Sequence, residues 1–457
     1  MDTKALRQKI LDLAIHGKLV PQDPNDEPAS VLLERIRTEK ERLIKEGKIK
    51  KGKKSAKTSD KPHYPFELPK GWVWCKLDDI AYVASGSTPE KSSFVPKGIP
   101  YIKMYNLRNQ KIDFEYKPQY ITAEIHNGKL QRSRTEVGDL IMNIVGPPLG
   151  KLAIIPPSLP QANFNQAAVL IRPYLHKDNI NVYLKAYLEE MSEINSISTK
   201  GSAGQVNISL TQSQNMRIPL PPLPEIERII KNLKYWLSFV DNIEENKEKL
   251  QDSIRQVKSK ILDLAIHGKL VPQDSNDEPA IELLKRINPK AEIITDNGHY
   301  QQLPSGWAIC RLEDVVQYEQ PTPYIVKSTN YDNSYKTPVL TAGKSFVMGY
   351  TNETKGIYTS LPCIIFDDFT TDSKLVKFQF KVKSSAMKIL QVVKGVNIEY
   401  VSMFMSITRL IGDTHKRYWI SEYSKIEIPI PPLEEQRRIV DIVELIFNKL
   451  DTISKRL

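Results

Sequence analysis

The chain repeats a long segment of its own sequence. The fifteen residues KILDLAIHGKLVPQD at 9–23 occur again, unchanged, at 260–274, which is 251 positions later. A proline-rich block, Ile-Pro-(Leu/Ile)-Pro-Pro-Leu, stands at 218–223 and again at 428–433. Collinear repeats of this quality indicate a duplicated structural frame. Each half of the chain must therefore build the same framework in the same order, which limits the possible folds.

The two copies of the frame enclose different sequences. A Leu-Pro-x-Gly-Trp block begins at Leu68 and again at Leu303, and the segments that follow, 76–215 and 311–425, share no obvious sequence. A chain of 457 residues has room for about three domains of ordinary size. We therefore predict an α+β protein with two globular α/β domains, each carried by one copy of the frame and each presenting its own recognition surface.

A heptad pattern follows the first proline-rich block. From Ile226 to Leu264, eleven of twelve seam positions are apolar, which is typical of a coiled-coil helix, here about 58 Å long. The alternative is a long core helix in one large domain. The predicted helix-seam and partner-contact residues are Ile229, Leu233, Trp236, Val240, Ile243, Leu250, Ile254 and Val257 in the central segment, and Ile439, Val443, Ile446, Leu450, Ile453 and Leu457 at the C-terminus.

The two ends of the chain complete one copy of this helix. In repeat positions Leu457 matches Lys247, and Met1 matches Asp252. The C-terminal helix thus stops close to where the N-terminal helix begins. We expect a pseudo-twofold internal repeat in which two long antiparallel coiled-coil helices separate the two globular domains.

The charge indicates a polyanionic partner. Lys and Arg number 65 against 54 Asp and Glu, which gives a formal net charge of +11 and a pI near 9.1. Nucleic acid is the usual partner of such a protein, and a basic solvated surface is the alternative. No apolar run approaches the length of a membrane span, no signal sequence is evident, and three cysteines make no disulfide framework. We therefore expect a cytoplasmic protein that does not associate with membranes.

Sequence motifs for catalysis are weak. Residues 342–345 read like the end of a phosphate-binding loop, but Pro338 stands where its first glycine belongs. Asp367 and Asp368 with Lys374 faintly resemble the acidic pair and lysine of a metal-dependent nuclease. A freestanding DNA nuclease or methyltransferase with duplicated DNA-binding halves therefore remains the alternative. We expect no catalytic, cofactor-binding or metal-binding residues in this chain.

The repeated frame resembles a known family, the specificity (S) subunits of type I restriction-modification systems (HsdS family). The resemblance rests on the paired proline-rich and Leu-Pro-x-Gly-Trp blocks and on the long helices. Segments 138–141 and 150–155 are similar to the strand-turn-strand typical of the recognition domains of this family, and 337–344 with 365–374 resemble another common version of the same domain. The usual Glu-Gln after the proline-rich block is kept at 435–436 but is Glu-Ile in the first copy.

The resemblance implies a non-catalytic subunit that recognises DNA. Two target-recognition domains would each read half of a bipartite double-stranded site. The helical regions would bind two modification (M) subunits and scaffold the restriction (R) subunits. S-adenosylmethionine, ATP and Mg are then expected on those partners. The implied segments are an N-terminal helix with a basic linker (1–62), recognition domain 1 (63–217), a central helical region with linker (218–300), recognition domain 2 (301–427) and a C-terminal helix (428–457).

Candidate DNA contacts lie in clusters of basic and amide side chains. Base edges are read mainly by Arg, Lys, Asn and Gln, and phosphates are bound by Lys, Arg and Ser. For any single residue, an ordinary solvated side chain is the alternative, and this is also the favoured interpretation of the basic tract 45–61. The candidates are Lys103, Tyr105, Asn106, Arg108, Lys151, Lys200 and Gln205 in the first insert, and Lys344, Thr371, Lys374, Lys383, Ser384, Lys388, Lys416 and Arg417 in the second.

Overall fold

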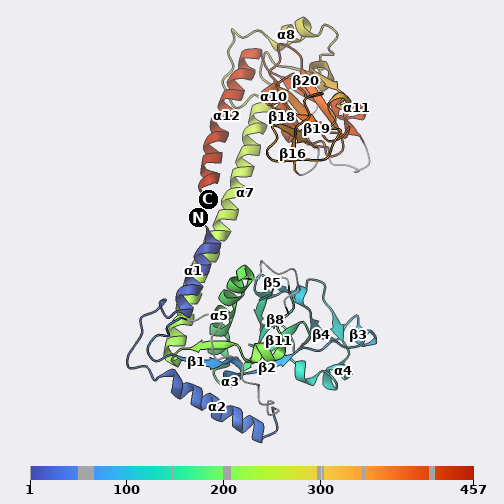
Figure 1. The fold of residues 1–457 in the computed structure, drawn as a ribbon. Coiled ribbons are helices and arrows are strands. Elements are labelled where there is room, and N and C mark those ends of the chain that lie inside the picture. The colour runs from blue at the N-terminus through green and yellow to red at the C-terminus, as the bar shows by residue number, and fades with distance from the viewer. Residues whose placement is uncertain are drawn as a thin grey trace. The chain divides into compact units, whose positions relative to one another are not determined.

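A computed structural model gives the structure of this protein (Figure 1). The contacts divide the chain into two compact units, Met1–Glu245 and Asn246–Leu457, with the boundary inside its longest helix. No helix in the described part of the chain combines the length and apolar character needed to cross a membrane. The structure describes residues 2–49, 66–146, 149–198, 207–295, 300, 303–341, 345–410 and 417–457, with only the backbone described for 192–198.

Unit 1 carries the first insert on its copy of the frame. Its helices are α1 (Thr3–Ile15), α2 (Ala29–Lys45), α3 (Leu77–Ile80), α4 (Ala123–Asn127), α5 (Lys177–Ser198), α6 (Leu210–Gln214) and the first part of α7 (Leu223–Ile266). Its strands are β1 (Val73–Lys76), β2 (Ala81–Ser85), β3 (Phe94–Val95), β4 (Ile99–Ile102), β5 (Leu107–Arg108), β6 (Lys111–Ile112), β7 (Tyr120–Ile121), β8 (Leu140–Asn143), β9 (Leu152–Ile154), β10 (Asn163–Phe164), β11 (Ala168–Pro173) and β12 (Arg217–Leu220).

Unit 2 carries the second insert in the same way. Its helices are the remainder of α7, α8 (Ala280–Ile287), α9 (Leu312–Val315), α10 (Ile398–Ile407), α11 (Tyr418–Ser421) and α12 (Leu433–Arg456). Its strands are β13 (Ala308–Arg311), β14 (Val316–Glu319), β15 (Thr337–Leu340), β16 (Val347–Thr351), β17 (Cys363–Asp367), β18 (Ser373–Val376), β19 (Lys381–Val382), β20 (Met387–Val392) and β21 (Glu427–Ile430).

The larger sheets of the two inserts have the same strand order, and the smaller sheets share three matching strands, although the sequences differ. The larger sheets have the orders β2-β11-β8-β9 and β14-β20-β17-β18, and every pairing in them is antiparallel. In the smaller sheets β4 is parallel to β10 and antiparallel to β7, just as β15 is parallel to β19 and antiparallel to β16. Both inserts therefore belong to one α/β fold.

The central strands of each larger sheet are buried on both faces. In β8, Leu140 and Met142 belong to the core that includes α5, whereas Ile141 belongs to a second core with residues of the smaller sheet. In β17, Phe366 and Ile365 divide between two cores in the same way. Side chains alternate between the faces of a strand. Because both faces are covered, these strands are nearly continuous apolar runs, as expected for fully buried sheets.

Each insert is fastened to the helix that follows it by the same buried hydrogen bond. The Trp72 indole Nε1 donates to Glu225 Oε2 at 2.9 Å, and the Trp307 indole Nε1 donates to Glu435 Oε2 at 3.0 Å. In both units the strand after the tryptophan pairs antiparallel with the strand of the proline-rich block, β1 with β12 and β13 with β21. The repeated sequence blocks thus form the junction between insert and helix.

An ion pair and a glycine complete each junction. Arg228 of α7 pairs with Asp26 at 2.5 Å, and Arg438 of α12 pairs with Asp277 at 2.6 Å. Gly268 has a φ of +65°, and a Cβ there would lie 2.3 Å from Pro304 Cγ. A larger residue would therefore suffer both backbone strain and a clash. The repeated frame sequence therefore specifies backbone geometry at this glycine as well as apolar packing.

Helix α7 forms as one 44-residue helix, somewhat longer than the heptad segment predicts. The helix includes Pro224 because the first turn of a helix tolerates proline. In unit 1, Ile10 of α1 shares the apolar core with Val240 of α7, and Arg7 forms an ion pair with Asp241. Since the C-terminal end of α1 adjoins the start of α7 at the junction, α1 runs antiparallel to α7.

In unit 2, helix α12 packs on the C-terminal part of α7. Val443 and Ile261 share an apolar core. Lys258 Nζ donates to Asp451 Oδ1 at 2.6 Å and lies 4.8 Å from the centroid of the Phe447 ring. Each unit therefore contains one antiparallel helix pair.

Only one of the two predicted seam rows of α7 is well covered. Leu233 and Val240 are buried, but Trp236, Leu250 and Val257 are each at least 40% exposed. Ile453, a predicted seam residue of α12, is exposed as well. One partner helix covers only part of the circumference of α7, so the second apolar row remains open. The other predicted seam residues, Ile229, Ile254, Ile439 and Val443, are buried, whereas Ile243, Ile446, Leu450 and Leu457 are half-buried.

The junction carboxylates should make stability depend on pH. Burial raises the pKa of Glu435, while the Gln273 and Trp307 hydrogen bonds lower it less. A raised folded-state pKa contributes stability at low pH that is lost as pH rises through it. The Glu435→Gln substitution keeps an acceptor for Trp307 and removes the charge. We expect this variant to unfold at a higher temperature than the parent at about pH 7, with a smaller loss of stability between about pH 4 and about pH 7.

Calorimetric unfolding at several pH values checks this prediction. Glu434→Gln is the matched control, because Glu434 occupies the same helical turn and is exposed. A Glu435→Gln variant that is less stable than the parent at neutral pH, while the control is unchanged, would contradict it.

Candidate nucleic-acid interface

In the first insert, loops that are distant in sequence meet at one edge of the sheets. Leu152 N donates to Gln110 Oε1 at 2.7 Å, which joins the β5–β6 hairpin to β9. Ile144 N donates to Ala167 O at 2.9 Å, and Ile208 N donates to Ile144 O at 2.9 Å. We call this region the first loop edge; it consists of residues 103–112, 144–146, 149–151, 165–167 and 207–209.

The second insert has an equivalent edge. Asp368 N donates to Ala386 O at 3.4 Å, and Tyr418 N donates to Asp368 O at 2.9 Å. These two bonds repeat those of Ile144 at the same positions of the sheet. We call this region the second loop edge; it consists of residues 341, 345–346, 368–373, 383–386 and 417–419.

A third repeated bond confirms the equivalence. Asn165 N donates to Ile102 O at 3.1 Å in the first insert, and Lys383 N donates to Leu340 O at 2.8 Å in the second. Each bond joins the turn after the short parallel strand to the end of its neighbour. The loop edges are therefore the same end of one fold, and they bring together candidates that are scattered along the sequence.

At the first loop edge, a buried asparagine braces the loop that follows β4. Asn106 Oδ1 accepts from Lys103 N at 2.9 Å, and Asn106 Nδ2 donates to Asp113 O at 3.1 Å and Tyr116 O at 2.8 Å. Its side chain is fully buried. Asn106 therefore shapes the loop from inside.

A tight hairpin carries an exposed cation of this loop, Arg108. Asn109 and Gln110 have φ values of +48° and +56°, as the two central residues of a type I′ turn require. The turn presents Arg108, whose guanidinium lies 4.1 Å from the centroid of the Tyr116 ring, with Nε 3.4 Å from a carboxylate oxygen of Asp113. A guanidinium held flat on an aromatic ring retains donors for a base edge or a phosphate.

Tyr105 lies close to this hairpin. Burial raises the pKa of its phenol, so the hydroxyl stays protonated at neutral pH. The hydroxyl donates to Lys117 O at 3.2 Å. Its ring and that of Tyr116 lie edge to face, with centroids 6.2 Å apart.

At the second loop edge, two cations lie over aromatic rings. Lys374 Nζ is 4.4 Å from the centroid of the Phe346 ring, and the Arg417 guanidinium carbon is 5.9 Å from that of Phe369. Phe346, Phe369 and Lys374 line one open cleft, together with Thr370. The edge thus combines cations with half-buried aromatic rings, which suits a polyanion that carries aromatic bases.

Three candidates lie inside the domains, which corrects the expectation that they contact a partner directly. Asn106 is engaged as described above. Thr371 is fully buried, and its Oγ1 accepts from Leu410 N at 3.1 Å. Lys388 is 2% exposed, and its Nζ lies 3.6 Å from Asp368 Oδ2. These polar atoms are therefore already satisfied within the fold.

The other candidates divide by exposure. Arg108, Lys374, Lys383, Ser384 and Arg417 are exposed, whereas Lys103, Tyr105 and Lys151 are half-buried. Lys200, Gln205, Lys344, Lys416 and residues 50–61 of the basic tract lie outside the described residues. Sequence reasoning missed the supporting rings of Tyr116, Phe346 and Phe369, because only folding brings each ring beneath its cation.

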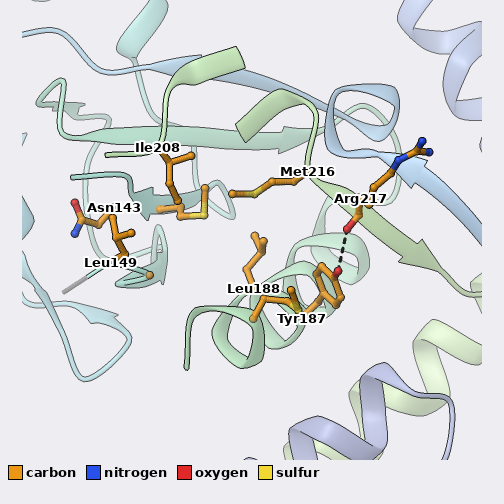
Figure 2. A pocket seen from close by; sticks show the side chains of 10 residues that line it. Asn143, Leu149, Tyr187, Leu188, Ile208, Met216 and Arg217 are labelled. Atoms are coloured by element: carbon orange, nitrogen blue, oxygen red, sulfur yellow. Dashed lines mark hydrogen bonds between the residues drawn. The ribbon is translucent and has the colours of Figure 1, made fainter. Parts of the chain in front are cut away.

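An apolar pocket lies beneath the first loop edge (Figure 2). Met142, Leu188 and Met216 line it, and the Tyr187 hydroxyl donates to Arg217 O at 2.9 Å beside it. A lining of this kind suits packing under the edge better than the binding of a polar ligand.

Comparison with known proteins identifies the class of this fold. The type I restriction modification DNA specificity domain matches residues 69–252 and 304–457. The matches cover both inserts and much of both helix pairs. The chain therefore belongs to the family of type I restriction-modification specificity subunits.

Individual relatives agree with this assignment. The chain is 32% identical over 385 residues to the type I restriction enzyme EcoAI specificity subunit of Escherichia coli, a match that covers 69% of this chain and 62% of the relative. It is 31% identical over 382 residues to the EcoEI specificity subunit of the same species, with 68% and 62% covered. The matched part thus spans less than two thirds of the length of these relatives.

A solved structure shows the same fold. One of its chains matches with a TM-score of 0.61 and 16% sequence identity, covering 86% of this chain and 94% of that one. That work is described as the structural basis underlying complex assembly and conformational transition of the type I R-M system.

Removal of the Asn106 side chain should loosen the first loop edge. Asn106→Ala leaves a buried N–H and two carbonyls without their partner, which costs roughly 1–3 kcal/mol. We expect a lower unfolding temperature and faster amide hydrogen exchange across residues 103–117. Asn109→Gly is the control, because the exposed Asn109 has a positive φ that glycine adopts readily. Unchanged exchange in the Asn106 variant would show that the loop is braced elsewhere.

Proposed function

We propose that this chain is the DNA-recognition subunit of a type I restriction-modification complex. Its two inserts each bind one half of a bipartite double-stranded site. The observation that carries the proposal is the pair of equivalent loop edges, which have the same backbone framework but different side chains. Membership of the specificity-subunit family and the net charge of +11 support it.

The two edges differ in the chemistry that they offer to DNA. The first edge presents Arg108 beside Tyr116, and the second presents Lys374, Lys383 and Arg417. Arginine and lysine pair with the acceptors of guanine in the major groove and also bind phosphates. Different cations on one framework would let the two domains prefer different half-sites.

Substitution of one cation at each edge tests this division. Arg108→Ala should weaken discrimination at one half-site, and Arg417→Ala should weaken it at the other, by about 1–3 kcal/mol each. The site is first found by sequencing the methylated bases of a host that carries the complex. Binding is then measured on DNA altered in one half at a time.

Lys129→Ala and Lys285→Ala are the charge-matched controls, because both lysines are exposed and lie outside the loop edges. Equal losses at both halves from either arginine substitution would contradict the assignment of one half-site to each domain.

We further propose that the helix pairs dock the partner subunits. Two M subunits bind the helical regions, which act as two antiparallel coiled coils in a pseudo-twofold arrangement, and R subunits join them. S-adenosylmethionine, ATP and Mg belong to those partners, and this chain performs no chemistry. The open apolar row of α7, with Trp236, Leu250 and Val257, supports docking because exposed apolar stripes mark interfaces. The alternative, a freestanding nuclease or methyltransferase, predicts cleavage or methylation by the purified chain alone with Mg, S-adenosylmethionine and ATP.

An aromatic cluster on α7 should anchor one partner. Tyr235, Trp236 and Phe239 are exposed, and their ring centroids lie 5.2–6.4 Å apart. In the second copy of the frame the matching residues are Leu445, Ile446 and Lys449, so the cluster occurs in one half only. Trp and Tyr dominate the energetics of interfaces.

The double substitution Trp236→Ala, Phe239→Ala should remove one of the two M subunits from the purified complex. The expected loss of affinity is at least about 2 kcal/mol for one docking site. Mass measurement of the assembled complex gives the stoichiometry. Lys234→Ala, in the same exposed turn, is the control. Retention of both M subunits by the double variant would show that the cluster is not the anchor.

A further inference from the structure

At one pair of matched, buried sheet positions, the first insert has apolar side chains and the second has charged ones. The pairing of Asn143 with Ala168 corresponds to that of Asp367 with Met387. The residues that follow therefore correspond as well. They are Ile144 and Val169 in the first insert, and Asp368 and Lys388 in the second. All four are buried.

An apolar pair thus occupies in one domain the place of an ion pair in the other. Lys388 Nζ lies 3.6 Å from Asp368 Oδ2, 3.4 Å from Gln320 Oε1 and 5.3 Å from the centroid of the Tyr318 ring. A buried ion pair is no more stable than well-packed apolar residues of similar size, and it is often less stable. Because Ile144 and Val169 serve the same sheet position, the fold does not require these charges.

The carboxylate has a second contact that explains its presence. Asp368 Oδ1 accepts from Trp419 N at 2.8 Å, and Asp368 O accepts from Tyr418 N at 2.9 Å. Asp368 therefore binds the segment that begins with Arg417 through both its backbone and its side chain. Arg417 lies over Phe369, which directly follows Asp368 in the chain.

The first insert satisfies the matching N–H in another way. Ser209 holds the place of Trp419, and its N–H donates to Gln212 Oε1 at 2.8 Å within the capping box of α6. That cap is local to one short helix. In the second insert, the Trp419 N–H is instead capped by the Asp368 carboxylate, which lies at the end of β17. Lys388 supplies the charge that balances this buried carboxylate.

We propose that Asp368 and Lys388 are a positioning pair for DNA recognition by the second domain. Asp368, held by Lys388, fixes the Arg417–Trp419 segment against the turn that carries Phe369. The orientation of Arg417 at the second loop edge, and hence selection of the second half-site, depends on this pair. The inference rests on the proposed function in DNA recognition.

The test uses the chain assembled with its M subunits. The double substitution Asp368→Ile, Lys388→Val installs the residues of the first insert and removes the cap of Trp419. We expect discrimination among second half-site sequences to fall by at least about tenfold. Discrimination at the first half-site and the unfolding temperature should stay close to those of the parent. Unchanged second half-site discrimination in the folded variant would overturn the proposal.

A second variant separates positioning from simple loss of structure. Asp368→Asn, Lys388→Met keeps an oxygen that accepts from Trp419 N and has no buried charge. We expect it to retain second half-site discrimination within about threefold of the parent. A loss as large as that of the first double variant, with an intact fold, would contradict the role of the Trp419 bond.

The same measurements separate this inference from the proposed function. A parent complex that discriminates at neither half-site refutes DNA recognition itself. A parent complex that discriminates at both, together with an unaffected Asp368→Ile, Lys388→Val variant, refutes only the positioning pair.

Discussion

Each half of the molecule depends on one buried hydrogen bond, from a tryptophan indole to a glutamate in the first turn of a long helix. Trp72 and Glu225 form it in unit 1, and Trp307 and Glu435 form it in unit 2. The bond joins the start of an insert to the helix that follows its end. Since an unpaired buried carboxylate or indole N–H would be costly, the contact orients insert and helix together. Everything that the insert presents at its loop edge is positioned through this contact.

The inserts show that one backbone framework can be built from unlike sequences. β8 and β17 hold the same place in matched sheets, yet their sequences read LIMN and CIIFD. A strand that is buried on both faces needs apolar residues, but many different apolar residues can fill the same positions. The loop edges share main-chain hydrogen bonds that do not depend on side-chain identity, and side chains specific to each insert, Asn106 and Asp368, add further bonds. Difference in recognition can therefore accumulate without loss of the fold.

The sequence predicted the long helix and the division into two inserts better than the exposure of individual side chains. The duplicated blocks and the heptads predicted α7 and two separate inserts, because repeats and apolar periodicity can be read directly from the sequence, whereas the contacts of the junctions cannot. The inserts share no obvious sequence, so their similarity was expected only from the family resemblance, and their common strand order could not be derived from the residues themselves. Lys388 was expected at the surface because lysine is rarely buried. Its burial depends on Asp368, twenty positions away, which only the folded sheet brings near. Trp236 was expected to be covered because it occupies a seam position of the heptad repeat. Whether it is covered depends on which face of α7 the partner helix packs against.

The indole–carboxylate hydrogen bond and the ion pair of each junction are made by residues of the repeated frame. Asp26, Trp72, Glu225 and Arg228 all lie outside segment 76–215, and the pairing of β1 with β12 brings the two boundaries of that segment side by side. The chain therefore enters and leaves the insert at neighbouring points of the frame. An exchange made at Cys75 and Met216 would leave these frame contacts in place, whereas the packing of Tyr183 on Trp72 and its hydrogen bond to Pro219 O would depend on the new insert. Under the proposed function, recombination at these boundaries would give the chain a new specificity without the intermediate steps that point mutation within a packed domain would require.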